Sequence, residues 1–354
     1  MRILLTNSFL ASRTGSEMAV RDFAVGLKRR NHAIEVYANV LTKAWRENLA
    51  RHGIRAVDRI EDLQQRPDVV HGQHTIAFLP CMIRFPDAGV VQWIHDIRDP
   101  IDTPLGHCAI AHHVAVDEFR ADRVAKALGT RDHVSVVANA VDLSRFSPHG
   151  LSADRRALCI LKRDGLERTR DVIAQAAAKT GWSAHFAGPG AGHEILNMPE
   201  TLRQFDLVVT SGRCALEALA MGRAVIACDG NRLGGLVTED TWARLRRNNI
   251  GLNAMTAVLN EDNALKEFAA VDLERTWAFA SQIRGEIDLE PRLDEIERLY
   301  RHVNRTHDPL LDRTARSAWA TDVERVAHAY AGHHLTHWRS VAAAADAADQ
   351  SALF

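Results

Sequence analysis

The sequence has few cysteines and no long hydrophobic run, and both shortages exclude classes of protein. Only five of its 354 residues are cysteines: Cys81, Cys108, Cys159, Cys214 and Cys228. An odd number of scattered cysteines, mostly within apolar runs, is typical of reduced, buried thiols and argues against a disulfide framework. No segment reaches the roughly 20 apolar residues that a membrane-spanning helix needs.

An excess of charge of either sign is also missing. The chain has 44 basic and 45 acidic residues, giving a formal net charge of -1. Nucleic-acid-binding proteins usually carry a basic excess, so no nucleic-acid partner is predicted. The basic run Lys28–Arg30 falls where the first predicted helix ends, and cations there suit the helix dipole better than they indicate a membrane-surface patch.

The first residues, MRILLTNSFL, contain a short apolar run that no small-residue cleavage site follows. This pattern predicts a core strand rather than a signal peptide. We therefore expect a cytoplasmic protein, either free or peripheral at the inner membrane face.

Several catalytic signatures are absent from the sequence. No G-x-S-x-G motif is present, which removes the commonest hydrolase signature. The loop after the first predicted strand has one glycine, Gly15, where a dinucleotide fold requires G-x-G-x-x-G, so an NAD-type site is disfavoured. Two histidine groups lack cysteine or carboxylate partners at metal-ligand spacing: His71 with His74, and His333, His334 and His337. No metal site and no cofactor are therefore predicted.

What the sequence does contain is a regular alternation of short apolar strands with helix-length stretches. Strands are predicted at residues 3–6, 34–37, 69–70, 90–94, 114–116 and 134–137, and again at 157–161, 184–187, 206–209 and 224–227. This rhythm predicts α/β architecture with a doubly wound parallel sheet in each half. A chain of 354 residues also exceeds what one core usually supports.

The turn-rich segment 139–150 indicates a boundary, which predicts an N-terminal domain over residues 1–150 and a second domain over 151–262. Residues 263–354 form a predicted helical segment. Apolar residues recur at helical spacing between Leu293 and Val303, and Thr321 with Glu324 has the pattern of a capping box. The extra amphipathic helices at the end of the chain are a candidate surface for homo-oligomer formation.

Candidate site residues follow the predicted strands, because ligands bind at the carboxyl edge of a doubly wound sheet. Gly15 opens the first helix, where backbone can approach an anion, although a plain turn explains it equally well. His95 follows strand 90–94, and histidine exchanges protons near neutrality, although a strand-end histidine taken alone is more often structural.

A second group lies in the second half, where Ser211, Gly212 and Arg213 immediately precede the helix that carries Glu217. A helix N-terminus, a hydroxyl and a guanidinium together suit a diphosphate, and Glu217 could reach ribose hydroxyls. The alternative is a capped helix in which Glu217 forms a structural ion pair.

Three cations, Lys162, Arg163 and Arg168, follow strand 157–161. They could neutralise phosphates and stabilise a departing nucleotide, or they could form a solvated loop. The segment Gly188–Gly192 resembles a nucleotide-binding glycine loop, which leaves open a methyltransferase or a dehydrogenase.

Six segments together resemble the retaining GT-B glycosyltransferases of the family-four, sucrose-synthase-like type (glycosyl transferases group 1). They are MRILLTNSFLASRTGSEMAVRDFAVGLKRRNHAIEVYA, RPDVVHGQH, VVQWIHDI, HVAVDEFRADRV, HVSVVANAVDLSRFSP and DLVVTSGRCALEALAMGRAVIACD. The resemblance covers roughly residues 1–240.

The resemblance implies two facing Rossmann-like domains with a C-terminal helical extension, of which a late helix crosses back to the first domain. It implies that the first domain binds the acceptor, that the second binds a nucleotide sugar, and that sugar transfer needs no metal and retains configuration. Gly15 would approach the donor diphosphate, and His95 would be the catalytic residue facing the reacting sugar. Lys162 or Arg163, with Arg168, would bind phosphate, and Glu217 would hold the ribose.

The working hypothesis is thus a glycosyltransferase with a nucleoside-diphosphate-sugar donor and a hydroxyl acceptor, which could be a polysaccharide, glycolipid, protein or small molecule. Two departures from the family pattern support an alternative, a catalytically silent GT-B module that binds sugar or partner proteins. No acid stands near Val209, where the family has a glutamate, and only a short stretch separates Gly192 from Asp206, so the second domain is trimmed.

Overall fold

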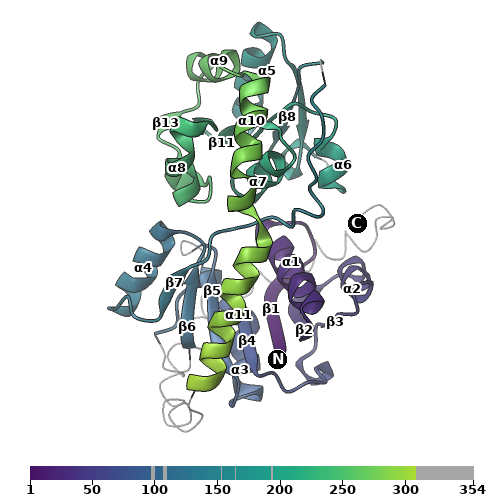
Figure 1. The fold of residues 1–354 in the computed structure, drawn as a ribbon, viewed down its shortest axis with the longest axis vertical. Coiled ribbons are helices and arrows are strands. Elements are labelled where there is room, and N and C mark those ends of the chain that lie inside the picture. Colours follow the sequence, from purple (N-terminus) through teal and green to yellow (C-terminus); the bar gives the residue numbers. More distant parts are fainter. Residues whose placement is uncertain (97–99, 107–109, 153, 164, 193, 308–354) are drawn as a thin grey trace. The chain divides into compact units, whose positions relative to one another are not determined.

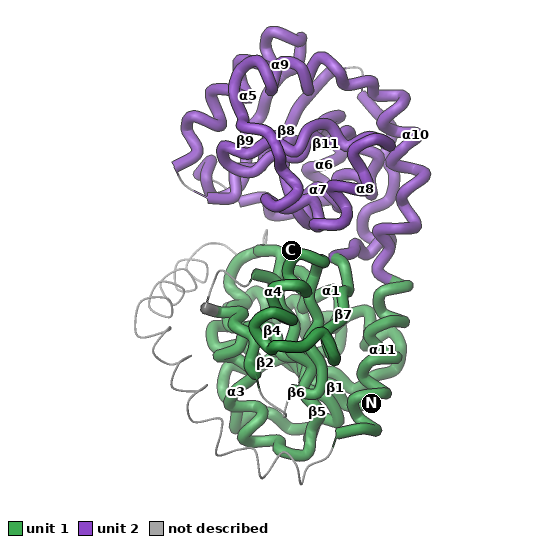
Figure 2. The backbone as a smooth tube through the Cα atoms, turned by 90° about the vertical axis from the view of Figure 1, so that its left-hand side faces the viewer, with its two compact units in different colours: residues 1–138, 290–354 green, residues 139–289 purple. Residues whose placement is uncertain are grey.

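The computed structural model describes residues 1–96, 100–106, 110–152, 154–163, 165–192 and 194–307 (Figure 1). The chain divides into two compact units, which Figure 2 colours separately. The first unit comprises residues 1–138 and the chain from residue 290 onward, and the second comprises residues 139–289. The predicted capping box at Thr321 and the predicted oligomerisation surface lie outside the described residues.

The first unit is built on a seven-stranded sheet with the strand order β3-β2-β1-β4-β5-β6-β7, in which every pairing is parallel. The strands are β1 (Arg2–Leu10), β2 (Ala33–Leu41), β3 (Arg55–Val57), β4 (Val69–Gln73), β5 (Gly89–Ile94), β6 (Ile110–Ala115) and β7 (Val134–Val136). The chain runs outward from β1 to β3 and then returns to place β4 on the other side of β1. The direction of winding therefore changes between β1 and β4, which is where ligands enter such sheets.

Helices cover the sheet of the first unit, and its central strands β4 and β5 are buried along their whole length. The helices are α1 (Gly15–Arg29), α2 (Lys43–Ala50), α3 (Thr75–Arg84), α4 (Glu118–Leu128) and α11 (Leu289–Thr306), with short 3-10 helices η1 (Ile60–Asp62) and η2 (Pro100–Asp102). Strands buried on both faces need continuous apolar runs rather than alternation. The sequence of β5, GVVQWI, is of this kind.

The helix α11 follows the second unit in the chain but packs within the first unit, across its sheet (Figure 1). Its face bearing Leu293, Tyr300 and Val303 is buried. A Cβ on Gly26 of α1 would come within 2.5 Å of Leu293, and one on Gly89 of β5 would overlap Val303. Glycine at these two places lets α11 approach both α1 and the sheet closely.

The second unit contains a six-stranded sheet with the order β13-β12-β11-β10-β8-β9. Its strands are β8 (Arg156–Ile160), β9 (Ser183–Ala187), β10 (Leu207–Thr210), β11 (Ala224–Asp229), β12 (Arg232–Leu236) and β13 (Ala257–Val258). The first four are parallel, and here the winding direction changes between β8 and β10.

The strands β12 and β13 are antiparallel, so this sheet departs from the wholly parallel one that was predicted. Only two residues separate β11 from β12, and the first of them, Gly230, has a φ of +59°. A two-residue connection with positive φ forms a hairpin and cannot form a parallel crossover.

Two apolar clusters cover the two faces of this second sheet. Successive residues of β10 contribute to opposite clusters, with Val208 packed in the cluster of Leu216 and Phe279 and Val209 in that of Ile173. The helices are α5 (Glu167–Lys179), α6 (Met198–Leu202), α7 (Gly212–Ala220), α8 (Glu239–Arg247), α9 (Glu261–Ala269) and α10 (Leu273–Ile283), with 3-10 helices η3 (Pro189–Ala191), η4 (Leu252–Ala254) and η5 (Arg284–Ile287). The division by contacts places α9 and α10 in the second unit, beyond the boundary predicted at residue 262.

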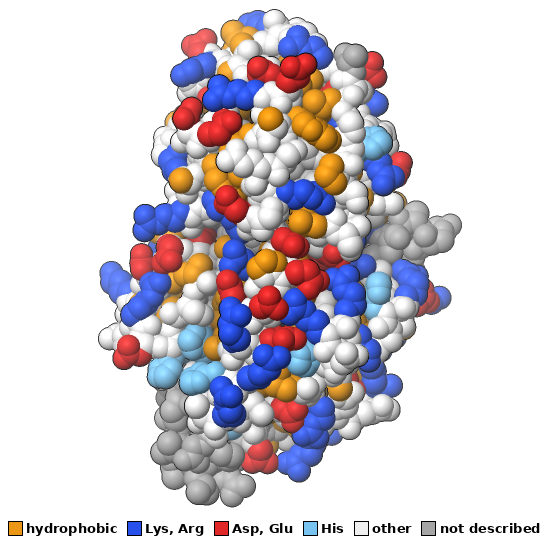
Figure 3. Space-filling view, viewed as in Figure 1, with side chains coloured by type: hydrophobic (Ala, Val, Ile, Leu, Met, Phe, Trp, Pro, Cys, Tyr) orange, Lys and Arg blue, Asp and Glu red, His pale blue; other side chains and the backbone are white. Residues whose placement is uncertain are grey.

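The predicted α/β class with two doubly wound, mainly parallel sheets is confirmed. Basic and acidic side chains are interspersed over both units on the face drawn in Figure 3. None of the helices in the described ranges combines the length and the apolar character needed to cross a membrane.

Candidate functional site

Three neighbouring strands of the second sheet end in polar residues that contact one another. Lys162 follows β8, Ser211 follows β10, and Asp229 ends β11. The Lys162 Nζ donates to the Ser211 carbonyl oxygen at 2.7 Å and to the Ser211 Oγ at 2.5 Å. The Ser211 Oγ in turn donates to Asp229 Oδ2 at 3.0 Å. These contacts lie where the winding of the sheet changes direction, the usual place for a ligand.

Arg163 joins the same group through its guanidinium, which lies 2.8 Å from Asp229 Oδ1. Its side chain is about half exposed (54%), whereas that of Asp229 is 13% exposed. We call Lys162, Arg163, Ser211 and Asp229 the strand-end cluster. Asp229 was not among the predicted site residues, although its carboxylate lies only two residues after the predicted strand 224–227. The cluster brings two cations and one carboxylate together, which leaves a net positive charge for an anion.

The helix α7 begins at this cluster, with Ser211 as its N-cap residue. The Ser211 hydroxyl does not cap the helix, because it is occupied by Asp229 and Lys162. Gly212 has a φ of +59°, the left-handed region that favours glycine. The positive end of the α7 dipole and the Lys162 ammonium thus lie close together, an arrangement that an incoming anion would stabilise.

Glu217 and Arg213, both predicted donor-binding residues, form a buried ion pair with each other on α7. The Arg213 Nε donates to Glu217 Oε1 at 2.8 Å, and the two side chains are 8% and 5% exposed. One helical turn separates them, which is the spacing at which side chains of opposite charge meet. The structure therefore contains the ion pair that was the alternative to ribose binding in the interpretation of Glu217. It lies within the helix that begins at the strand-end cluster.

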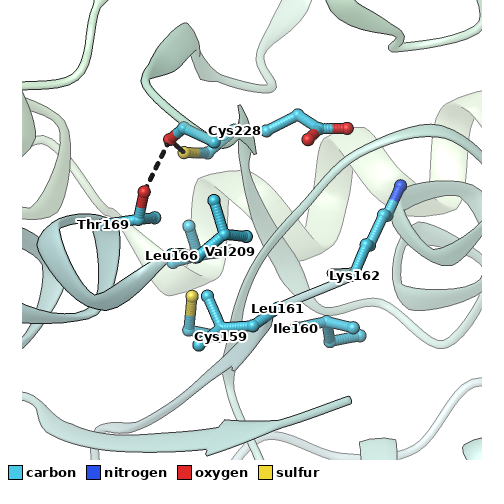
Figure 4. A pocket seen from close by; sticks show the side chains of 10 residues that line it. Cys159, Ile160, Leu161, Lys162, Leu166, Thr169, Val209 and Cys228 are labelled. Carbon is cyan, nitrogen blue, oxygen red and sulfur yellow. Dashed lines mark hydrogen bonds between the residues drawn. The ribbon is translucent and has the colours of Figure 1, made fainter. Parts of the chain in front are cut away.

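A small pocket lies beside the strand-end cluster, and Figure 4 shows its lining. It is lined by Cys159, Ile160, Leu161, Lys162, Leu166, Thr169, Val209, Cys228, Asp229 and Gly230. Burial raises the pKa of the Cys228 thiol to about 12, so this thiol is neutral near pH 7. Val209, where the resemblance expects an acid, is 1% exposed within the apolar core. Apart from Lys162, Asp229 and the Thr169 hydroxyl, the side chains that line the pocket are therefore apolar or neutral.

The glycine loop 188–192 packs against the backbone that carries the two cations. A Cβ on Gly188 would lie 2.5 Å from the Leu161 oxygen, and one on Gly190 would overlap the carbonyl oxygen of Arg163. The Gly190 amide also donates to the Leu161 oxygen at 3.0 Å. Contacts within the protein thus account for these glycines, which removes the reason for interpreting the loop as a methyltransferase or dehydrogenase signature.

Arg168 is not brought into the strand-end cluster. It lies exposed in the first turn of α5 and makes no hydrogen bond or ion pair with another residue of the described ranges. Its predicted part in phosphate binding stays a prediction.

Gly15 is the first residue of α1 in the first unit, and its surroundings are open. A Cβ built there meets no atom within 4 Å, so the packing of the protein does not require glycine at this position. The preceding loop is held by the buried Glu17 carboxylate, which accepts the backbone amides of Ala11 at 2.7 Å and of Thr14 at 2.8 Å. Thr14 and Glu17 form a capping box, so the strand-to-helix turn next to Gly15 is rigid.

His95 follows β5 at the carboxyl edge of the first sheet, as predicted from its place in the sequence. The backbone amides of His95 and Asp96 both donate to Asp102 Oδ2, at 2.7 and 2.8 Å. The imidazole Nε2 lies 3.0 Å from Gln73 Oε1 on the adjacent strand β4. A buried carboxylate and a neighbouring strand therefore fix both the backbone and the ring of His95.

His71 in the middle of β4 and His74 directly after this strand are both buried, and burial lowers the pKa of each to about 3. His71 bonds to side chains described below, and His74 Nδ1 accepts the amide of Ser8 at 3.3 Å. No group of three or more His, Cys, Asp or Glu side chains in the described ranges could hold a metal ion. The histidines His333, His334 and His337, which the sequence did not predict to bind a metal, lie outside those ranges.

No protein-family model matches the sequence, and no curated protein sequence matches it. The fold, however, is similar to that of solved glycosyltransferases. A glycosyltransferase from Rickettsia africae ESF-5 matches with a TM-score of 0.61 and 13% identity, over 86% of this chain and 99% of that one. HepE from Anabaena, in complex with UDP and glucose, matches with a TM-score of 0.57 and 15% identity, over 84% and 99%.

Sucrose-phosphate synthase from Thermosynechococcus elongatus matches with a TM-score of 0.54 and 11% identity, over 86% of this chain and 100% of that one. At these identities the likeness shows a shared fold, and the chemistry has to be argued from the residues of the site. The chain therefore has the α/β GT-B fold of these glycosyltransferases.

Proposed function

We propose that this protein is a glycosyltransferase that moves a sugar from a nucleoside-diphosphate sugar to a hydroxyl acceptor, with retention of configuration and without a metal ion. The observation that carries the proposal is the strand-end cluster, which places Lys162, Arg163 and the N-terminus of α7 at the point where the second sheet changes winding direction. The fold supports it, because HepE, which is similar to this chain, binds UDP and glucose.

The cluster has the groups that a diphosphate needs. An ammonium has three N–H donors, and Lys162 uses two of them on Ser211. The third can reach a phosphate oxygen, while Arg163 can offer its fork of donors. Positive charge held in place before the reaction stabilises the negative charge that develops on a departing nucleotide. Asp229 holds Arg163 and Ser211 in place until the diphosphate arrives.

The proposed ribose contact is Glu217, which the ion pair with Arg213 keeps oriented. A carboxylate has about four lone-pair sites, so binding Arg213 leaves capacity for ribose hydroxyls. In the first unit, Gly15 is proposed to admit the donor diphosphate and His95 to face the reacting sugar.

The first experiment compares thermal stabilisation by UDP, GDP, ADP and their sugars in wild type and in Lys162→Ala. A ligand at about 100 times its dissociation constant should stabilise the protein by roughly 2.7 kcal/mol. We expect one base to give this shift and Lys162→Ala to abolish it. Lys179→Ala is the matched control, because Lys179 is an exposed lysine on α5 that pairs with Glu261. No shift with any nucleotide would contradict the proposal.

Lys162 is a better test than Glu217, because removing Glu217 leaves Arg213 buried without its partner carboxylate. Breaking a buried ion pair from one side costs about 3–5 kcal/mol, which would mix unfolding with lost binding. Transfer itself is tested by incubating the stabilising donor with sugar acceptors and determining the anomeric configuration of the product by NMR. Unchanged rates in excess EDTA would support the metal-free mechanism.

The second candidate function is a silent GT-B module that binds nucleotide sugar without transferring it. Val209 is buried in the core, and the five-residue α6 is the only helix in the described part of the stretch between Gly192 and Asp206. Nucleotide binding without hydrolysis or transfer, over a broad panel of donors and acceptors, would favour this candidate.

A further inference from the structure

Four side chains of the first unit form a continuous row of hydrogen bonds that ends at His95. The Tyr300 hydroxyl on α11 bonds to His71 Nδ1, and His71 Nε2 lies 3.0 Å from Gln73 Nε2. Gln73 Oε1 lies 3.0 Å from His95 Nε2. His71 and Gln73 are two residues apart on β4 and therefore lie on the same face of the strand. We call Tyr300, His71 and Gln73 the buried relay, because all three are 0% exposed and lead from the interior to the sheet edge.

The chemistry of each group fixes the direction of the hydrogen bonds. An amide nitrogen only donates, so His71 Nε2 must accept from Gln73. Burial lowers the pKa of His71 to about 3, and the neutral ring then carries its single hydrogen on Nδ1. This hydrogen is donated to the Tyr300 oxygen. At the other end an amide oxygen only accepts, so His95 Nε2 must carry a hydrogen and donate it to Gln73.

Packing prevents the His71 ring from turning. Trp93 stacks on it at a ring-centroid distance of 4.6 Å with an interplanar angle of 14°. Phe23 of α1 contacts the same ring at 5.5 Å. Tyr300 is held from the other side, because α11 is seated against α1 and β5 by Leu293 and Val303. The packing of α1, β5 and α11 therefore positions the relay, in addition to its hydrogen bonds.

We propose that the buried relay holds the neutral His95 ring as its Nε2–H tautomer, which leaves Nδ1 as the nitrogen that accepts hydrogen bonds. Tyr300, His71 and Gln73 are then positioning residues for His95. The part of this inference that concerns the reaction rests on the proposed function. There, His95 accepts a hydrogen bond through Nδ1 from a hydroxyl of the bound sugar, while its single N–H is donated to Gln73.

The tautomer is read in the full-length protein without any substrate, by long-range proton–nitrogen NMR of histidine labelled with nitrogen-15. We expect the wild-type His95 signals of the Nε2–H form. In Tyr300→Phe, the His71 Nδ1–H loses its acceptor, and an unsatisfied buried donor is costly. The proton of His71 then moves to Nε2, Gln73 turns its oxygen toward His71, and the Gln73 amide donates to His95. We therefore expect Tyr300→Phe to shift His95 toward the Nδ1–H form.

Two further variants keep the test decisive. Gln73→Leu removes the contact to His95, and a mixture of tautomers is expected. Tyr37→Phe is the matched control, because Tyr37 is another buried tyrosine of the first unit whose hydroxyl bonds to Asn39 and not to the relay. It should leave the His95 signals unchanged. An Nδ1–H form in wild type, or signals that neither Tyr300→Phe nor Gln73→Leu changes, would overturn the proposal.

Activity separates this inference from the proposed function. With a transferring donor and acceptor, Tyr300→Phe should lower kcat roughly tenfold with little change in KM for the donor, since losing a hydrogen bond that is made mainly in the transition state costs rate rather than binding. A tautomer shift with unchanged kcat would show that the relay positions His95 but that His95 has no part in transfer. That result would overturn the step at the sugar hydroxyl and leave nucleotide binding at the strand-end cluster intact.

Discussion

Asp229 accepts hydrogen bonds from two groups that a diphosphate would also use, the Arg163 guanidinium and the Ser211 hydroxyl. Its carboxylate keeps these donors oriented in the absence of ligand, and it also opposes an arriving anion by like-charge repulsion. A substitution that removes the negative charge but keeps the shape of the side chain separates the orienting effect from the repulsion. An asparagine would keep its carbonyl oxygen for Arg163 and could donate its amide to the Ser211 oxygen, so the negative charge is removed while both contacts can persist.

We predict that Asp229→Asn tightens nucleotide binding about fivefold, equivalent to roughly 1 kcal/mol, the size expected for one nearby partly exposed charge. Titration calorimetry with the stabilising nucleotide measures this, and raising the salt concentration should reduce the difference between variant and wild type. Weaker binding by Asp229→Asn would show instead that the carboxylate acts mainly by orienting Arg163.

The residues of the strand-end cluster were accessible from the sequence to different degrees. Lys162 and Ser211 could be predicted because each directly follows an apolar strand. The proposed part of Gln73 in positioning His95 could not be predicted. It depends on the contact between Tyr300 and His71, which are 229 positions apart in the sequence. No spacing rule connects residues so far apart. The predicted contribution of Arg168 depended on the direction of an exposed side chain, which sequence does not specify.

At the scale of elements, the glycine loop after β9 determines where the Lys162–Arg163 segment can lie. Gly190 packs directly under the Arg163 carbonyl oxygen, and backbone on both sides leaves no flexible atom that could move aside. The loop therefore links an edge strand of the sheet to the site.

We predict that Gly190→Ala destabilises the second unit by roughly 1–3 kcal/mol, as overpacking does, and weakens nucleotide binding by shifting the Arg163 backbone. Gly150→Ala is the matched control, since a Cβ there meets no atom within 4 Å. Urea unfolding measures the first effect and calorimetric titration the second. Normal stability and affinity in Gly190→Ala would contradict the packing role of the loop.

The helix α11 is fixed to α1 by polar contacts in addition to its apolar face. Glu297 accepts from the buried His32 Nε2 at 2.8 Å, and Arg30 and Arg301 lie close by. Burial opposes ionisation of Glu297, but the hydrogen bond from His32 and the two arginines lower its pKa below the usual 4.5. A lowered folded-state pKa stabilises the protein above pH 4.5, and this stabilisation is lost as the pH falls through the lowered value.

We predict that Glu297→Gln lowers the free energy of unfolding by about 1–2 kcal/mol at pH 7, the range expected for a hydrogen bond to a charged group. The difference from wild type should shrink as the pH falls below 4.5, where the carboxylate of the unfolded state is protonated first and that of the folded state follows at lower pH. Urea unfolding at pH 7 and pH 3.5 tests this, with Glu295→Gln as a control on the same helix, since Glu295 pairs with Arg292 one turn away. A difference that does not depend on pH would contradict the assignment.

The strands that are continuous apolar runs were predicted correctly from the sequence. Strands whose formation depends on packing against a neighbouring strand were not. The runs at β5 and β8 were found within one residue of their observed bounds. The strand β12, with the sequence RLGGL, carries two glycines and no β-branched residue, so its local propensity argues against a strand. It forms because the turn at Gly230 lays it against β11. The strand β3 is only three residues long, too short to show any period.

For the whole molecule, the two passages of chain between the units are joined to each other within the second unit. Val141 donates its amide to the Ile287 oxygen at 2.8 Å, and Leu289 donates to the Val141 oxygen at 3.0 Å. Arg284 adds bonds to the carbonyl oxygens of Leu143 at 3.1 Å and Phe146 at 3.0 Å. The segments through which the chain enters and leaves the second unit are thus held together by these hydrogen bonds.

We predict that Arg284→Met destabilises the second unit by about 2–3 kcal/mol, because it leaves carbonyl groups without their donor. The burial that lowers the pKa of Arg284 also shields these carbonyls from water. Arg275→Met is the control, since Arg275 forms an exposed pair with Glu239 and should have almost no effect. Calorimetry with and without the stabilising nucleotide measures both. Equal effects of the two substitutions would contradict a special role for Arg284.

The discontinuous first unit also has a consequence for biosynthesis. On the ribosome, residues 1–138 emerge first, but their sheet lacks α11 until residues 289–306 have been made. The second unit is contiguous and can close before the first is complete. Until α11 arrives, Gly26 and Gly89 face an empty groove, and His71 lacks the Tyr300 hydroxyl. A nascent chain can thus complete its second unit first, and α11 later brings the Tyr300 hydroxyl to His71.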